Sequence, residues 1–218
     1  MTEDGTGLMA FWATIDEDYL NRFREWHNCE HMPERVSIPG FQVGRRYIEC
    51  GDPATYLMTY QTRDSAVLGS QPYLEALNAP SDWTRESLPH FNNPVRNIYT
   101  RLAANGETNY VAAPYVYALR FNADADGLAE AAASLAGDEQ LGQVALYRVD
   151  EAISGIQTSE RKIYGGGPGE QRWLLFVEAT LAGAADGSAL AGRLASLAAD
   201  WQDVFQGLFA IDYVLAKP

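Results

Sequence analysis

The chain is poor in cysteine, lysine and histidine, and it has no long hydrophobic run. Cys29 and Cys50 are the only cysteines among 218 residues, too few for a disulfide framework, and a cytoplasmic location is therefore expected. Only 2 of the 16 basic residues are lysines and the net charge is -13, which argues against nucleic acid and anionic membranes as partners. No apolar run approaches the roughly 20 residues of a membrane span. The acidic first residues do not have the character of a signal peptide.

The chain does contain enough apolar material for a core, with 47% hydrophobic and 11% aromatic residues, and this excludes a mainly disordered chain. Its predicted elements follow one order twice. The first set comprises strands over 8–15, 41–50, 55–62 and 95–103 and helices over 17–31 and about 65–77. The second set comprises strands over 115–122, 143–150, 172–179 and 208–216 and helices over 124–137 and 188–201. We therefore predict two ferredoxin-like β-α-β-β-α-β units, residues 1–104 and 105–218.

Several predicted strands carry apolar side chains on both faces. Phe11 is followed by Trp12, and Leu174 by Leu175. A single ferredoxin-like unit covers only one face of its sheet with helices, whereas these strands indicate that both faces are covered. The expected fold is therefore α+β, with the two units packed as an intramolecular α+β barrel.

The two units differ in chemistry. All three histidines and both cysteines lie in the first unit, which we expect to carry the active site. The second unit has a Gly-rich stretch over 164–169 and is interpreted either as a structural twin or as the source of a lid, loop 151–170. The GGGPG string has no strand-to-helix context, and nucleotide binding is therefore rejected.

The predicted helix over 17–31 carries two candidate catalytic side chains, Glu30 and His31. At 100° per residue, Glu30 falls on the same stripe as Phe23 and Trp26. Because Pro33 disfavours a helical residue before it, the helix is expected to end or kink near His31. The helix dipole and an acidic neighbour would draw His31 towards the protonated form, whereas burial would oppose this. A pKa near neutrality would suit general acid–base catalysis.

This region also resembles a known family. The resemblance rests on Trp26, Glu30-His31, Pro33-Glu34-Arg35, Ile38–Phe41 and Gly44–Tyr47, with Tyr73 and the stretch Trp83 to Tyr99. These residues resemble the dimeric α+β barrel superfamily, in its EthD-like branch, and the second half would make a tandem single-chain form. The superfamily includes cofactor-free cyclases, isomerases, lyases and monooxygenases of small aromatic or polyketide-like molecules, along with haem enzymes. His31 matches the family histidine at the end of the first helix.

Two cofactor-dependent alternatives compete with this interpretation. Residues 27–31 read H-x-x-E-H, in which His27 and His31 could share a zinc ion, with His90 or Glu34 as a third ligand. Haem bound through a histidine is the other alternative, because b-type binding needs no motif. The preferred prediction has no metal and no cofactor, since Pro33 follows at once and no third zinc ligand is evident.

The segment 80–96 mixes aromatic and basic residues of the kind that line pockets. Trp83 and His90 are candidate walls of a substrate pocket. Arg96 could bind a carboxylate or pair with Glu30 or Glu34. Arg35 is a candidate to bind or polarise oxygen functions, and Tyr47 to point its hydroxyl into a cavity.

These observations predict a cofactor-independent enzyme that acts by proton transfer on a small hydrophobic molecule, aromatic or cyclic. Lyase, isomerase or cyclase chemistry is expected, with His31 as acid or base and Glu30 as its partner or as a second catalytic carboxylate. The alternative is a non-catalytic small-molecule binder or an accessory component of an oxidative degradation system. A homodimer is a further expectation, although nothing in the sequence specifies its surface.

Overall fold

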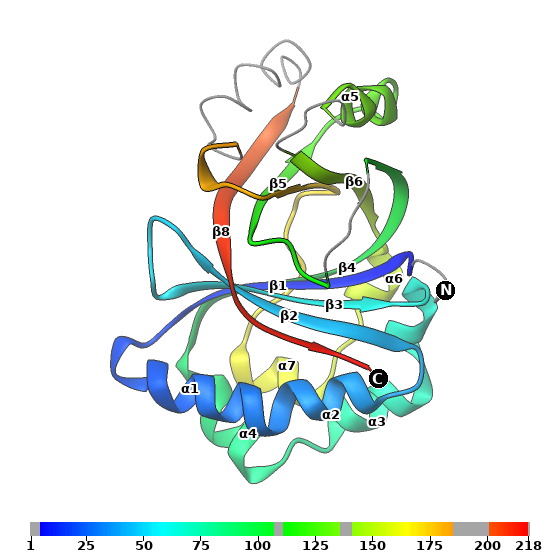
Figure 1. Ribbon diagram of the computed structural model, residues 1–218. Helices are drawn as coiled ribbons and strands as arrows, with labels where there is room; N and C mark the ends of the chain where they lie inside the picture. Colours follow the sequence, from blue (N-terminus) through cyan, green and yellow to red (C-terminus); the bar gives the residue numbers. More distant parts are fainter. Residues whose placement is uncertain (1–4, 107–110, 136–140, 185–200, 218) are drawn as a thin grey trace.

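The chain folds into one closed barrel of eight antiparallel strands (Figure 1). The computed structural model describes residues 5–106, 111–135, 141–184 and 201–217. Around the barrel the strands follow the order β1-β3-β2-β8-β5-β7-β6-β4. Their bounds are β1 Gly7–Ile15, β2 Phe41–Glu49, β3 Thr55–Thr62, β4 Phe91–Asn105, β5 Tyr115–Asn122, β6 Leu141–Val149, β7 Trp173–Ala179 and β8 Gln202–Ala216.

The barrel is made of two units with the same internal order. The first contributes β4-β1-β3-β2 and the second β8-β5-β7-β6, so each unit places its fourth strand beside its first. Two long strands of 15 residues join the units, because β4 pairs with β6 and β8 pairs with β2. The predicted α+β fold, an intramolecular barrel of ferredoxin-like units, is confirmed.

The doubly apolar strands explain why the barrel closes. Trp12 and Leu174 belong to the cluster that fills the barrel interior, while their neighbours Phe11 and Leu175 pack in separate clusters outside it. Residues of one strand that alternate in sequence thus serve two cores. Closure also removes the exposed sheet edges that an isolated unit would present to solvent.

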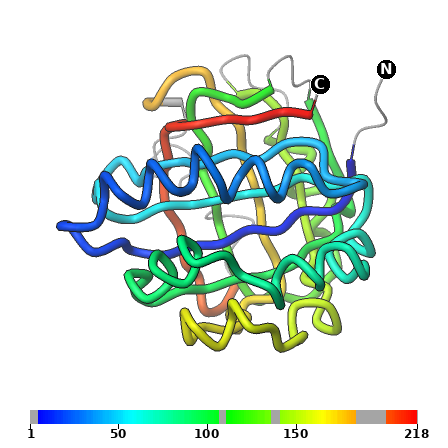
Figure 2. The backbone as a smooth tube through the Cα atoms, turned by 90° about the horizontal axis from the view of Figure 1, so that it is seen from below, coloured from blue at the N-terminus to red at the C-terminus, as the bar shows by residue number. Residues whose placement is uncertain are grey.

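Helices cover the outer face of the first unit. In Figures 1 and 2 a layer of helices lies against β1, β2 and β3. Its members are α1 Leu20–Trp26, α2 Met32–Ser37, α3 Gln71–Asn78, α4 Asp82–Ser87, α6 Glu151–Ser154 and α7 Ser159–Tyr164, with short helices η1 Glu17–Tyr19, η2 His27–His31, η3 Ser65–Gly69 and η4 Leu88–His90. The second unit carries α5 Leu128–Leu135 and η5 Ala182–Ala184. Because α6 and α7 belong to the second half of the chain, both units build this layer.

Of the two outcomes expected near His31, an end or a kink, the helix does not end there: it passes through a π turn and continues beyond Pro33. The segment η2 is a π turn, in which the Met32 backbone N–H donates to the His27 carbonyl five residues earlier. Met32 keeps helical angles of φ -67° and ψ -43°, and α2 continues to Ser37. The wider π turn absorbs the missing N–H and the ring of the proline that would clash in a regular α-helix.

Two further predicted elements differ from the structure, and a third cannot be compared with it. Segment 151–170 is not an irregular loop, because it contains α6 and α7. The last strand begins at Gln202 rather than 208. The helix expected over 188–201 falls almost entirely outside the described residues.

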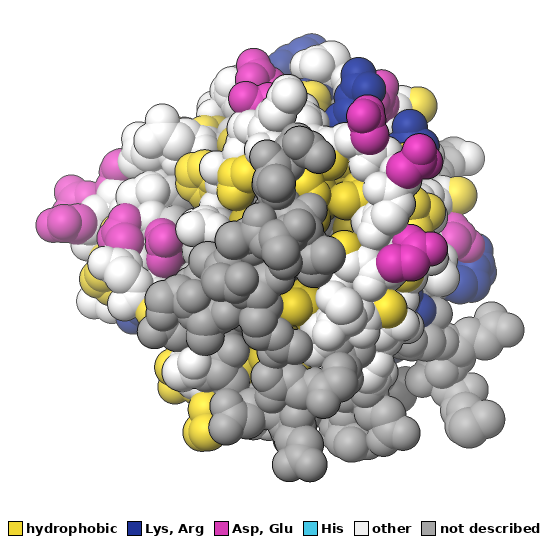
Figure 3. All heavy atoms as spheres, turned by 90° about the horizontal axis from the view of Figure 1, so that it is seen from above, with side chains coloured by type: hydrophobic (Ala, Val, Ile, Leu, Met, Phe, Trp, Pro, Cys, Tyr) yellow, Lys and Arg dark blue, Asp and Glu magenta, His cyan; other side chains and the backbone are white. Residues whose placement is uncertain are grey.

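No helix in the described part of the chain is long and apolar enough to cross a membrane. Figure 3, which views the molecule from above, shows hydrophobic side chains exposed between polar ones on that face.

Candidate functional site

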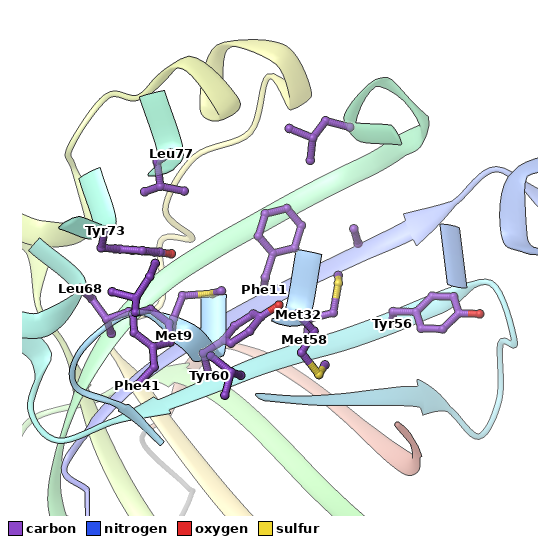
Figure 4. Close-up of a cluster of buried hydrophobic side chains, with 14 of the residues drawn as sticks. Met9, Phe11, Met32, Phe41, Tyr56, Met58, Tyr60, Leu68, Tyr73 and Leu77 are labelled. Atoms are coloured by element: carbon purple, nitrogen blue, oxygen red, sulfur yellow. The ribbon is translucent and has the colours of Figure 1, made fainter. Parts of the chain in front are cut away.

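A cavity of about 40 Å³ lies between the outer face of the first sheet and the helix layer. Figure 4 shows how the side chains of this region, such as Phe11, Tyr60 and Tyr73, fill the space between the sheet and the helices. The walls are formed by Met9, Phe11, Trp26, His27, His31, Arg35, Met58, Tyr60, Tyr73, Leu77, Leu88, Phe91, Arg96, Thr158, Glu160 and Tyr164. The cavity is therefore mainly apolar and aromatic, with a few polar groups set among the rings.

The register of β1, β3 and β4 determines which side chains form the floor of the cavity. Across β1 and β3, Met9 is opposite Tyr60 and Phe11 is opposite Met58. Across β1 and β4, Phe11 is opposite Arg96. Alternate residues of a strand share a face, so these five side chains all point towards the helices while their neighbours enter the barrel interior.

His27 is fixed in a neutral form by its contacts. Its Nδ1 lies 3.3 Å from Nη1 of Arg46, and its Nε2 lies 3.4 Å from the hydroxyl oxygen of Tyr60. A guanidinium can only donate, so Nδ1 must accept, which leaves the ring proton on Nε2. Burial, together with the charges of Arg46 and Arg35, lowers the pKa of His27 well below its usual value. His27 thus connects β2, β3 and the π turn as a neutral structural group.

His31 lies one turn further along and has a free nitrogen. Its ring packs on Trp26 with 4.4 Å between ring centroids, and it lines the cavity. The ring retains partial exposure, but Nδ1 is buried and has no hydrogen-bond partner among the residues that the structure describes. An unpaired buried nitrogen carries a desolvation cost, and a proton-bearing ligand in the cavity could offset that cost.

The charge state of His31 differs from the expectation of a pKa near neutrality. Burial, then the guanidinium of Arg35, and then His27 lower the pKa of His31 well below its usual value. The helix does not end at this residue, so no C-terminal dipole favours the cation there. His31 is consequently neutral at pH 7, which makes it a base rather than an acid.

Arg35 links the first unit to α7. Its guanidinium, only 2% exposed, forms an ion pair with the equally buried Glu160, 125 residues further along the chain. Glu34 lies 3.3 Å from Nη1 of Arg35 as a second, partly exposed counter-charge. Both counter-charges raise the pKa of Arg35, which therefore stays cationic although it is buried.

The Gly-rich stretch after α7 holds this segment against β4. Gly166 approaches Pro94 so closely that an added Cβ would lie 2.5 Å from the Pro94 carbonyl oxygen, and only glycine fits. Gly167 pairs with Val95, and its carbonyl accepts from the Arg96 backbone N–H at 3.0 Å. The close backbone approach brings α7, with its side chains Thr158, Glu160 and Tyr164, onto the cavity. Whether the segment opens as a lid stays a prediction.

Arg96 and two tyrosines complete the polar part of the wall. Nη2 of Arg96 donates to the Tyr73 hydroxyl at 3.0 Å, and the guanidinium lies 5.9 Å from the Tyr73 ring centroid. Tyr164 packs edge-on against Phe11 at 5.1 Å. Burial raises the pKa of Tyr164 to about 12, so its hydroxyl keeps its proton at neutral pH.

Four residues proposed from the sequence lie away from the cavity walls. Glu30 accepts from the Ser81 hydroxyl at 2.5 Å at the start of α4, because the π turn changes the direction in which side chains of this turn point. His90 pairs with Asp16 at 2.9 Å. The other two are Trp83, whose ring lies under Arg22, and Tyr47, which belongs to the barrel interior. Of the proposed residues, the structure brings His31, Arg35 and Arg96 together.

Sequence reasoning missed several cavity residues. Tyr60 carried a usable signal, since it alternates with Met58 on a predicted strand and therefore shares its face. Glu160 and Tyr164 were missed because residues 151–170 were predicted to be a loop. Two helix caps were readable there: Asp150 accepts from the Ile153 backbone N–H at 3.0 Å, and Thr158 accepts from that of Arg161 at 3.3 Å.

The residues present do not fit a zinc or haem site. Nδ1 of His27 is occupied by Arg46, and the nearby guanidiniums of Arg35 and Arg46 oppose a cation. Within the described residues no three His, Cys, Asp or Glu side chains are grouped to hold a metal ion. Trp26 covers the ring of His31, and a cavity of about 40 Å³ is far too small for a porphyrin.

Comparison with solved structures supports the fold. An anthrone oxidase-like protein matches with a TM-score of 0.62 at 11% identity, covering 99% of this chain and 94% of that one. A "putative monooxygenase" from Fusobacterium nucleatum matches at 0.61 and 9%, covering 98% and 95%. A chlorite dismutase variant from Candidatus Nitrospira defluvii matches at 0.53 and 14%, covering 96% and 92%. All three have the dimeric α+β barrel fold. No protein-family model and no curated protein matches the chain.

Proposed function

We propose that the protein is an enzyme that removes a proton from a small cyclic or aromatic carbonyl compound, with His31 as the base. The observation that carries this proposal is the neutral His31 with an unpartnered buried nitrogen, set in a cavity that also holds two guanidiniums. A neutral imidazole is ready to accept a proton at pH 7. Arg35, whose guanidinium lies close enough to His31 to lower its pKa, stabilises the negative charge that develops on the carbonyl oxygen.

The proposed step is simple to balance. A lone pair of His31 takes a proton from a carbon that is next to the carbonyl or conjugated with it through a ring, and the C–H electrons are delocalised onto the oxygen to give an enolate beside the cationic wall. Return of the proton to another carbon gives an isomerase, and loss of a leaving group gives a lyase. The aromatic walls, among them Phe11, Trp26 and Phe91, exclude water and hold a ring.

The neighbours suggest which compounds to test first. An anthrone is a cyclic aromatic ketone with an acidic methylene group, and its enolate form is the kind of intermediate that this cavity would stabilise. Because a cavity of about 40 Å³ is too small for three fused rings, monocyclic ketones with an acidic methylene group are the first members of the panel. A non-catalytic binder remains the alternative proposal, and it predicts ligand binding without any proton exchange.

The test is hydrogen exchange of the substrate in D2O, followed by NMR. His31→Ala should lower the exchange rate by roughly 10²–10⁴, the range for one general base. Cys29→Ala, an exposed neighbour on the same π turn, is the matched control and should leave the rate unchanged. Because the pKa of His31 is lowered, activity should persist below pH 6.5. A fully active, folded His31→Ala protein would refute the proposal.

A further inference from the structure

The two guanidiniums of the cavity wall are not equally paired with carboxylates. Two guanidiniums, Arg35 and Arg96, face one carboxylate, Glu160, and burial keeps His27 and His31 neutral. Glu160 is committed to Arg35, which also has Glu34 beside it. Neither of these two carboxylates forms an ion pair with Arg96.

The guanidinium that lacks an ion pair among the described residues is that of Arg96. The residue is 9% exposed, and within the described part of the chain no carboxylate forms an ion pair with it. The two structural partners that the sequence allowed are both engaged elsewhere, since Glu30 accepts from Ser81 and Glu34 pairs with Arg35. Its hydrogen-bonding partner is the hydroxyl of Tyr73. A buried cation without an anion is costly, and an anionic ligand would remove that cost.

We infer that the substrate is a ring-bearing carboxylate whose carboxylate group binds to Arg96. The inference rests on the proposed function, because it names the substrate class of the same site. A carboxylate is ionised at pH 7 without help, whereas a phenol of ordinary pKa about 10 is not. The planar fork of a guanidinium matches the two oxygens of a carboxylate. The apolar walls disfavour an inorganic anion, which would have no ring to bury.

The ring contacts show where the rest of the ligand lies. Phe11 is the direct neighbour of Arg96 across β1 and β4. From Phe11 the aromatic wall continues to Phe91 at 5.6 Å, from Phe91 to Trp26 at 6.1 Å, and from Trp26 to His31 at 4.4 Å. A carboxylate held at Arg96 thus leaves its ring against this wall, which leads to the base.

The experiment compares charged and neutral ligands of one shape by calorimetry. Benzoate, phenylacetate and cyclohexanecarboxylate are titrated beside their amides, with phenol and sulfate as further probes. At least one carboxylate should bind the unaltered protein about 10- to 100-fold more tightly than its amide, the range expected for hydrogen bonds to a charged group. Arg96→Gln should remove this preference and Arg96→Lys should keep part of it. Arg85→Gln on exposed α4 is the matched control and should have no effect.

Several results would overturn the inference: amides or phenol that bind as tightly as the carboxylates, sulfate that binds equally well, or a preference that survives Arg96→Gln. If Arg96→Gln does not fold, Arg96→Lys and the acid–amide comparison on the unaltered protein still decide. Failure of the proposed function looks different, because acids would then bind through Arg96 without proton exchange. Exchange that occurs on neutral ketones and not on carboxylates would instead preserve the catalytic proposal and refute this one.

Discussion

Acid should destabilise this protein through two buried histidines. The folded-state pKa values of His27 and His31 are both lowered well below the ordinary 6.5. Below pH 6.5 the unfolded chain therefore binds more protons at these residues than the folded chain does. The contribution of each histidine to stability is complete above pH 6.5 and is lost as the pH falls from 6.5 towards the lowered folded value. Between pH 7.5 and 5.5 each histidine costs at most about 1.4 kcal/mol, the limit reached when the folded form takes up no proton, or about 2.7 kcal/mol for the two. That limit is a large part of a typical folding free energy.

Urea unfolding at several values from pH 7.5 to 5.5 measures this loss. His27→Gln and His31→Gln should each reduce the pH-dependent loss by about half, and the double variant should nearly abolish it. The comparison between variants at each pH cancels the contribution of the carboxylates. His27→Gln will also lower stability at all pH values, because His27 contacts Arg46 and Tyr60; the slope is therefore the informative quantity. An equal slope in the unaltered protein and the double variant would refute the reasoning.

Two further substitutions test local features of the first unit's helix layer, the packing at Gly44 and the N-cap of α6. Gly44→Ala places a Cβ 2.8 Å from Met32 Cγ and 3.0 Å from a ring carbon of Tyr60; urea unfolding should show a loss of about 1–3 kcal/mol, whereas Gly51→Ala, which meets nothing within 4 Å, should show little change. Asp150→Ala removes the N-cap of α6 and should cost about 1 kcal/mol in the same assay; Asp150→Asn, which can still cap, should cost less, and equal losses for the two would contradict the capping argument.

The fold was predictable because its signals are local and repeated. Strand alternation and the doubled element order require only neighbouring residues, and the pairs Phe11-Trp12 and Leu174-Leu175 show that both sheet faces are buried. The site was less predictable because it depends on contacts between distant residues. The ion pair of Arg35 with Glu160 spans 125 positions, and nothing in the local sequence of either residue indicates the other.

The direction of Glu30 and the continuation of the helix through Pro33 could not be read from the sequence, for a different reason. Both predictions assumed regular α-helical geometry, in which a proline ends the helix and residue 30 shares a stripe with Trp26. The π turn over 27–31 breaks that assumption, and a single widened turn cannot be read from periodicity. The same turn explains why Glu30 contacts α4 while His31 lines the cavity.

The π turn carries two histidines, His27 and His31, which have similar electrostatic surroundings but different roles. Both rings are neutral for the same physical reasons, burial and nearby guanidiniums. The difference lies in their lone pairs: that of His27 is engaged by Arg46, whereas Nδ1 of His31 has no partner. A base must have an unengaged lone pair within reach of a substrate. Among the three histidines of the chain, His31 combines such a nitrogen with a place on the cavity wall, because His90 pairs with Asp16 outside it.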